Sequence, residues 1–133
     1  MWTVQRNVGR LLEARVGSLQ TREEVATFSD ECRRLMKRGG PPVVVCADYR
    51  AVQVFSPATA EALKENLRDM NPLIARSGLL IAPDHAINLM QMSRVARESG
   101  SQRRTFVDKA PLRAWLDELL TPDEQARLAA FLG

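Results

Sequence analysis

Five polar side chains follow the two most apolar runs of the sequence, where they could act together in chemistry. These residues are Asp48, Tyr49, Arg50, Asp84 and His85. Ligands of open α/β sheets bind outside the carboxyl ends of the strands. A carboxylate, a phenol, a guanidinium and an imidazole at this edge could therefore form the rim of a polar ligand pocket. The same residue types are also typical of loop capping and of solvated charge, and the sequence leaves both interpretations open.

Acid–base or nucleophilic catalysis requires more than these residue types. A catalytic histidine must lie within hydrogen-bond reach of a nucleophile and be oriented by a third group, and His85 is the only histidine. The sequence contains no nucleophile motif and no glycine-rich phosphate loop. Cys32, Cys46 and His85 do not supply the three or four ligands of a zinc site at a recognisable spacing. We therefore expect no enzyme activity, no metal and no cofactor.

Ser56 is the strongest single candidate for a regulatory site. It precedes Pro57 in the pattern of a helix N-cap followed by proline at the first helical position. A phosphate on Ser56 would be stabilised by the free amide groups and the dipole at the start of that helix. As an ordinary N-cap, the same serine would contribute about 1 kcal/mol to stability. Ser56 is thus a candidate both for a helix cap and for a phosphorylated switch.

The elements that would position these residues can be predicted from hydrophobic periodicity and capping signals. Short strands are expected at residues 2–6 and 11–16, and three inner strands at residues 43–47, 79–82 and 104–107. Helices are expected at residues 21–38, from Ser56 to Arg76 with an interruption at Pro72, and at residues 86–98, 112–119 and 121–132. Capping boxes at Thr21–Glu24 and Thr121–Glu124 mark the starts of two of these helices.

The alternation of strands and helices predicts an α/β fold with right-handed crossovers. We expect a single domain over residues 1–133, with a mixed, mostly parallel sheet of four to five strands and helices packed around it. The core of the domain would cover about residues 2–120, and a short C-terminal helix would cover residues 121–132.

The composition is typical of one globular domain. The 133 residues are 45% hydrophobic and 26% charged, with a formal net charge of +3. No apolar run approaches the roughly 20 residues of a transmembrane segment, and the basic residues lack the interleaved aromatic residues of nucleic-acid-binding surfaces. Cys32 and Cys46 occupy apolar positions and are expected in the core, which fits a reducing, cytoplasmic location. The excess of arginine over lysine favours a bacterial origin.

The segment 86–98 combines a broad apolar surface with basic residues. Met90 and Met92 are two residues apart and cannot both point into the core, and methionine is common at adaptable binding surfaces. Arginines at the end of this segment could attract an acidic partner or anionic lipid headgroups. The candidate interface comprises Ile87, Met90, Met92, Arg94 and Arg97. It would hold a protein partner or a second copy in a homodimer; the alternatives are a helix wedged inside the fold and arginines that are simply solvated.

Two stretches resemble the STAS and SpoIIAA-like group of bacterial domains. The first, Val43–Leu63, contains an apolar strand, an Asp-Tyr-Arg loop, and Ser-Pro-Ala-Thr at a helix start. The second, Arg103–Leu116, is similar to the closing strand and Trp-Leu helix of the SpoIIAA-like branch. The resemblance implies a small α/β domain over about residues 2–120 that binds a partner protein and has no catalytic activity.

The resemblance also bears on Ser56. In the phosphorylated members of this group, a kinase modifies a serine where the helix after the central strand begins. Ser56 is the nearest match, but the acidic neighbour and the glycine of the family phrase are missing from Phe55–Thr59. Other relatives bind nucleotides or resemble lipid-binding domains. We therefore carry two hypotheses: a non-catalytic interaction domain in signalling or assembly, regulated at Ser56, and a nucleotide- or lipid-binding domain with a pocket at the strand ends.

Overall fold

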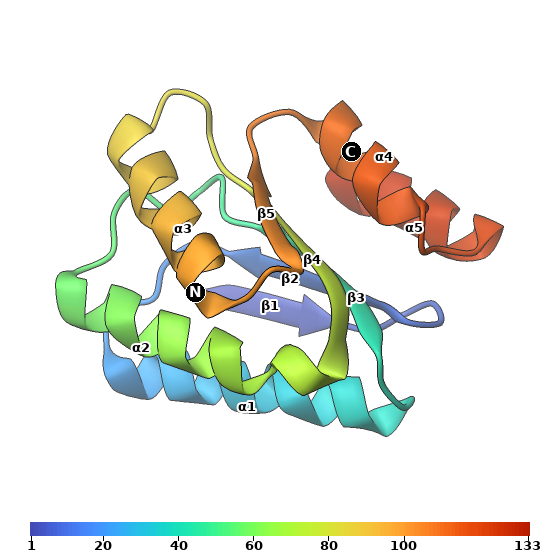
Figure 1. Cartoon of the computed structure of the whole chain (residues 1–133), viewed down its shortest axis with the longest axis horizontal. Coiled ribbons are helices and arrows are strands. Elements are labelled where there is room, and N and C mark those ends of the chain that lie inside the picture. The colour runs from blue at the N-terminus through green and yellow to red at the C-terminus, as the bar shows by residue number, and fades with distance from the viewer.

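A five-stranded sheet forms the centre of the computed structural model, which describes residues 1–133 (Figure 1). Its strands are β1 (Trp2–Gln5), β2 (Leu11–Val16), β3 (Val43–Asp48), β4 (Ile74–Leu80) and β5 (Arg103–Phe106). They lie side by side in the order in which they occur along the chain. β1 is antiparallel to β2, and all later neighbours are parallel. The predicted α/β class, with a mixed and mostly parallel sheet, is confirmed.

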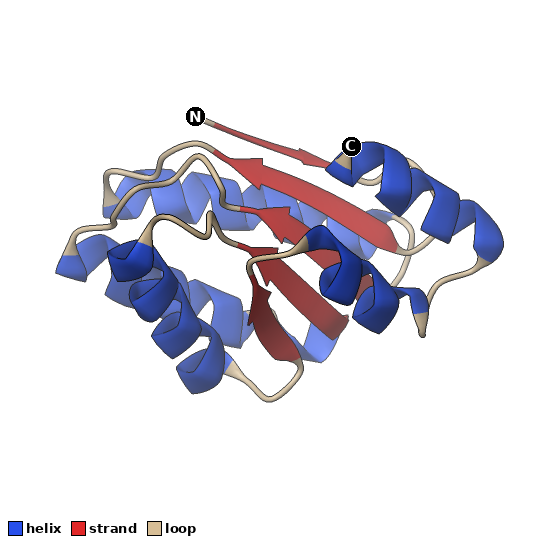
Figure 2. Cartoon of the chain, turned by 90° about the horizontal axis from the view of Figure 1, so that it is seen from above, coloured by secondary structure: helices blue, strands red, loops and turns tan.

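The helices divide between the two faces of the sheet (Figure 2). The first three are α1 (Arg22–Arg38), α2 (Pro57–Asp69) and α3 (Ala86–Ser99). They connect successive parallel strands and cover one face, and a short 3-10 helix (Asn71–Leu73) follows α2. The other face is covered by α4 (Lys109–Asp117) and α5 (Pro122–Leu132). The expected short C-terminal helix is therefore present as α5.

Local sequence signals explain where the helices begin and which side they bury. At α1, the hydroxyl of Thr21 accepts a hydrogen bond from the backbone N–H of Glu24 at 3.0 Å, as N-cap residues do. The glutamate side chain accepts from the backbone of Gln20, so this predicted capping box forms only in part. Five apolar residues at helical spacing are buried along α1: Val25, Phe28, Cys32, Leu35 and Met36. The box that opens α5 at Thr121 is complete.

Each face of the sheet has its own apolar core. The face under α1, α2 and α3 holds a cluster of 24 buried residues, and the face under α4 and α5 holds a cluster of nine. Cys32 belongs to the larger cluster and Cys46 to the smaller, and both thiols are free. Burial raises the pKa of each thiol to about 12. Both cysteines therefore behave as core residues, as the sequence indicates.

The prediction for the segment between α2 and β4 was wrong. Residues 74–76 do not continue the helix, because β4 begins at Ile74 and runs through Ser77 and Gly78. That dipeptide looks like a turn in the sequence, yet Gly78 is needed inside the strand. A Cβ atom there would collide with Leu112 of α4, which packs directly on the strand at this point.

The prediction that residues 104–107 form an inner strand was also wrong. β5 pairs with β4 alone and is therefore one of the two edge strands of the sheet, with β1 at the other edge. Its apolar residues misled the prediction because Phe106 packs beneath Trp115 of α4, with the two ring centroids 5.7 Å apart. None of the helices combines the length and the apolar composition of a membrane-spanning segment.

Candidate functional site

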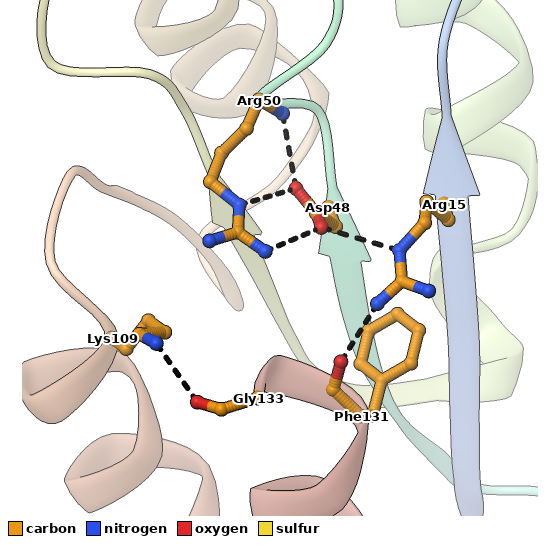
Figure 3. A network of polar contacts seen from close by, with 6 residues as sticks. All are labelled: Arg15, Asp48, Arg50, Lys109, Phe131 and Gly133. Atoms are coloured by element: carbon orange, nitrogen blue, oxygen red, sulfur yellow. Dashed lines mark hydrogen bonds and ion pairs between the residues drawn. The ribbon is translucent and has the colours of Figure 1, made fainter.

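The carboxylate of Asp48 lies at the centre of a polar network at the end of β3 (Figure 3). Arg50 donates to both carboxylate oxygens, from Nε at 3.0 Å and from Nη2 at 2.9 Å, and its backbone N–H adds a third bond at 3.0 Å. Arg15 of β2 approaches the same carboxylate at 3.4 Å. Asp48 is 5% exposed, so its hydrogen-bonding capacity is used within the protein rather than offered to a ligand.

Electrostatics keep this carboxylate ionised. Burial raises the pKa of Asp48, but hydrogen bonds from the side chain and backbone of Arg50 and from Arg15 lower it further than burial raises it. The net pKa of Asp48 therefore lies below its ordinary value. The hydrogen bond to Asp48 in turn raises the pKa of Arg50. The network is an internal ion cluster. The pKa of its carboxyl group is lowered, whereas a general acid needs a carboxyl group with a raised pKa.

The same network anchors the end of the chain (Figure 3). Arg15 donates to the carbonyl oxygen of Phe131 at 2.7 Å, and its guanidinium lies 4.4 Å from the centroid of the Phe131 ring. Lys109 at the start of α4 donates to the carbonyl oxygen of Gly133 at 2.8 Å. These contacts join β2, α4 and α5 at the carboxyl edge of the sheet. Asp48 and Arg15 thus stabilise the packing of the C-terminal helices.

Tyr49 does not lie on a ligand rim, which corrects the sequence prediction. Its side chain turns into the larger core, is 1% exposed, and contacts Phe55 edge to face with centroids 6.4 Å apart. Burial raises the pKa of its phenol. Tyr49 lines a cavity of about 20 Å³ together with Cys32, Ser77 and Arg103. A cavity of this size has room for about one water molecule, far below the roughly 300 Å³ of a ligand pocket.

Asp84 and His85 lie apart from the Asp48 network. They precede α3 and line an open groove of about 470 Å³ with Val54 and Ile87. The Nδ1 atom of His85 is 3.4 Å from the carbonyl oxygen of Val52. The five predicted rim residues are therefore split between the ion cluster, the core and this groove, and they do not form one pocket.

The exposed face of α3 presents a different kind of surface. Ile87 and Met90 are 71% and 75% exposed, and Val54 from the loop before α2 is 55% exposed. Val54 and Ile87 line the same groove, and Ile87 and Met90 are neighbours at helical i,i+3 spacing. We call these three residues the apolar patch. They are three of the four large hydrophobic residues that the fold leaves exposed, the fourth being Met1.

The predicted interface residues fall on this face of α3 with one exception. At 100° per residue, four of them share a single stripe along the helix, which we call the α3 stripe: Ile87, Met90, Arg94 and Arg97. Met92 is 0% exposed and belongs to the larger core, so its assignment to the interface was wrong. Two methionines two residues apart face different sides of a helix, and here only Met90 faces outward.

The loop that carries Val54 is held against α3 by side-chain amides. Gln91 accepts from the backbone N–H of Phe55 at 2.9 Å and donates to its carbonyl oxygen at 2.8 Å. Asn88 donates to the carbonyl oxygen of Val52 at 2.9 Å. These bonds fix the loop and the helix relative to each other. The apolar patch is therefore held in place by the fold.

The basic end of the α3 stripe contains one paired and one free arginine. Arg94 donates to Glu98 at 2.8 Å, and Lys64 of α2 contacts the same carboxylate at 3.2 Å. Arg97 is exposed and forms no ion pair in the fold. The stripe therefore runs from apolar side chains near the start of α3 to an unpaired positive charge near its end.

Ser56 caps α2 as the sequence indicates. Its hydroxyl oxygen accepts from the backbone N–H of Thr59 at 3.2 Å, and the hydroxyl donates to Oγ1 of Thr59 at 2.9 Å. Ser56 is exposed and Pro57 occupies the first turn of the helix. The residue is therefore accessible at a helix N-terminus, two positions after Val54.

Sequence reasoning missed two residues of this part of the fold. Val54 lies in a loop without hydrophobic periodicity, so no pattern marks it as part of a surface. No pattern in the sequence distinguishes Arg103 from an exposed arginine, yet it is 5% exposed and donates to the carbonyl oxygen of Leu67 at 2.7 Å and to Oδ1 of Asn71. Burial lowers the pKa of Arg103 to about 10. Its positive charge caps the C-terminal end of α2, where the helix dipole favours a cation.

Comparison of the sequence with models of known protein families and with curated proteins finds no match.

Proposed function

We propose that the protein is a non-catalytic interaction domain that binds a partner protein through the apolar patch and the α3 stripe. The observation that carries this proposal is the exposure of Ile87 and Met90, at 71% and 75%, beside an exposed Val54. Contiguous exposed apolar side chains rimmed by polar residues are typical of interaction sites. The rigid attachment of the Val54 loop to α3 supports a preformed surface.

The charge pattern indicates what kind of partner fits. Arg94 and Arg97 lie next to the apolar patch on the same side of α3, and the whole chain carries a formal net charge of +3. A complementary partner presents apolar side chains flanked by Asp or Glu. An acidic amphipathic helix has this pattern and can lay its apolar face on an apolar helix surface.

The resemblance to STAS and SpoIIAA-like domains supports the same class of function. That resemblance implies a bacterial domain in signalling or assembly, acting in the cytoplasm through a partner protein. It also makes the start of α2 a regulatory position, since Ser56 is exposed there and lies two residues from Val54. A phosphate on Ser56 would place negative charge beside the surface that binds the acidic partner, and would weaken that complex by repulsion.

The alternative of a nucleotide or lipid carrier finds less support in the geometry. The cavity enclosed in the core measures about 20 Å³, whereas ligand pockets typically measure at least about 300 Å³. The groove of about 470 Å³ at Asp84 and His85 is large enough but is open to solvent, so it would not enclose a small ligand. The predicted rim residues do not converge, and Asp48 is already bonded to two arginines. An interaction domain is therefore the function that the geometry supports best.

Native mass spectrometry of complexes purified from the cell of origin tests the proposal. Three forms are compared: the wild type, Met90→Lys in the apolar patch, and Ala26→Lys on the exposed side of α1 as a control for the added charge. We expect the wild type and Ala26→Lys to retain the same partner protein and Met90→Lys to lose it, at equal melting temperatures. Equal partner content in all three forms, or a partner in none, would contradict the proposal.

A further inference from the structure

The outer edge of β5 carries backbone groups that have no strand partner. β5 pairs with β4 on one side only. The carbonyl oxygens of Gln102 and Phe106 accept hydrogen bonds from backbone N–H groups in and just after β4, at 3.0 and 2.8 Å. Successive peptide groups of a strand point to opposite edges. The N–H and C=O groups of Arg103 and Thr105 therefore point outward, as two donors and two acceptors on a free edge.

A polar groove of about 520 Å³ lies at this edge, between β5 and the C-terminal half of α3. Its polar side chains are hydroxyl and guanidinium groups, among them those of Ser93, Arg97, Ser101 and Thr105. The hydroxyl oxygens of Ser93 and Thr105 are 3.1 Å apart, which ties α3 to the strand. On the opposite face of the sheet, Arg104 lies over the ring of Trp115 at 4.9 Å. The groove thus has fixed walls beside an open backbone edge.

We propose that this edge binds an extended, acidic segment of a partner protein, which adds to the sheet as a further strand. Only an extended chain can match donors and acceptors that alternate along a strand, as in other cases of strand addition. We infer a negatively charged segment because Arg97 and Arg104 offer it positive charges. Both are exposed, and neither forms an ion pair in the fold.

The same charges disfavour a second copy of this chain as the added strand. In a dimer with a two-fold axis, the β5 strands of the two copies would pair with each other in antiparallel fashion. All four outward groups take part only in the register that places Arg104 directly opposite Arg104 of the other copy. Like charges directly opposite each other on neighbouring strands are destabilising. An acidic residue opposite Arg104 reverses the sign of this interaction, so the edge favours a different, acidic chain.

This binding edge is distinct from the surface of the proposed function. It uses the backbone of β5 and does not involve Ile87 or Met90; Arg97 alone is common to both surfaces. Loss of binding at one surface therefore leaves the other testable.

Thr105 provides a matched pair of variants for the test. Thr105→Pro removes an outward N–H group and keeps the ladder with β4, since proline is tolerated where the N–H of an edge strand faces solvent. Thr105→Val keeps that N–H group and loses the same hydroxyl contact to Ser93. Arg104→Glu reverses the charge and leaves the backbone unchanged. Thermal melts followed by circular dichroism establish that each variant is folded.

A phage-displayed library of random peptides, panned on the purified wild-type protein, supplies the probe. We expect the enriched peptides to be rich in Asp and Glu, and to bind Thr105→Pro and Arg104→Glu at least about tenfold more weakly, a loss of about 1.4 kcal/mol. Binding to Thr105→Val should stay close to that of the wild type. Should Thr105→Pro fail to fold, Arg104→Glu alone decides the outcome.

Three results would overturn the inference. The first is a panning experiment that enriches no acidic peptides. The second is enriched peptides that bind the wild type and Arg104→Glu equally. The third is a wild-type dimer, seen by analytical ultracentrifugation, that dissociates in Thr105→Pro and remains intact in Thr105→Val, because that result assigns the edge to a second copy of the chain.

Discussion

At the scale of single residues, Asp48 shows how a polar side chain at a strand end can be structural. Its carboxylate receives hydrogen bonds from Arg50 and Arg15, and its pKa lies below the ordinary 3.8. A carboxyl group whose pKa is lower in the folded state contributes stability above its unfolded pKa, and loses that contribution as pH falls through the folded value.

This linkage predicts the effect of Asp48→Asn across the acid range. The wild type should be more stable than the variant at pH 6, and the difference in unfolding free energy should shrink as the pH falls below about 4. Glu31, Glu98 and Glu124 also have lowered pKa values, but they titrate alike in both proteins. Urea unfolding of both forms between pH 3 and pH 6 measures the difference. A difference independent of pH would show that the ion cluster does not stabilise the fold.

Ser56 allows charge and capping to be separated at one residue. Aspartate and asparagine cap helices about as well as serine does, so Ser56→Asp and Ser56→Asn should both melt near the wild-type temperature. We expect Ser56→Asp to weaken partner binding and Ser56→Asn to leave it unchanged. Isothermal titration with the isolated partner measures this effect. Equal affinities of the two variants would remove Ser56 as a charge-operated switch.

At the scale of elements, α5 depends on polar contacts because the apolar core beneath α4 and α5 is small. Arg127 of α5 bonds the buried carboxylate of Glu13 from two nitrogens, at 2.8 and 2.6 Å. The buried carboxylate of Glu124 accepts from the backbone N–H of Arg10 at 2.5 Å. Together these contacts attach the start and the middle of the helix to β2 and to the residue that precedes it.

Removing Arg127 should leave the Glu13 carboxylate buried without its cation. We expect Arg127→Ala to lower the unfolding free energy clearly more than the control variant does, because the buried carboxylate of Glu13 loses its cation. The control Arg22→Ala breaks an exposed pair with Glu65, at 3.7 Å, and should cost less than about 1 kcal/mol. Chemical denaturation measures both. Similar losses in the two variants would mean that the Glu13–Arg127 pair does not hold α5.

The contact between β4 and α4 is tight enough to require glycine. Gly78→Ala places a methyl group against Leu112 and should cost about 1–3 kcal/mol. Leu112→Val withdraws the colliding atom, so the double variant should lose less than the sum of the two single losses, by at least about 0.5 kcal/mol. A double-mutant cycle of unfolding free energies measures this coupling. Strictly additive losses would show that Leu112 is not the neighbour that excludes a side chain.

The elements also show what periodicity can and cannot predict. The apolar stripe of α1 and the caps at Thr21, Ser56 and Thr121 were readable because they depend on residues close in sequence. The start of β4 and the edge position of β5 were not, because both are set by pairing between strands that lie far apart in the sequence. Tyr49 was misplaced for a similar reason: only the tertiary fold decides which way a residue after a strand turns.

At the scale of the whole molecule, the sheet order separates the two kinds of surface. Strands that follow one another in sequence place α1, α2 and α3 on one face, which leaves α3 as the last helix beside the β5 edge (Figure 1). An order without reversal also lacks the switch point at which open α/β sheets bind ligands. The surface of α3, rather than a cleft at the strand ends, is therefore where the fold presents its exposed apolar side chains.

Site-specific photo-crosslinking in the cell of origin tests the central claim most directly. Benzoylphenylalanine is placed at position 90 in the apolar patch, or at position 26 on α1 as the control. The account predicts one discrete adduct from position 90, absent from position 26, whose cross-linked segment contains apolar residues flanked by Asp or Glu. The same adducts from both positions, none from position 90, or an adduct only with a second copy of the chain would contradict it.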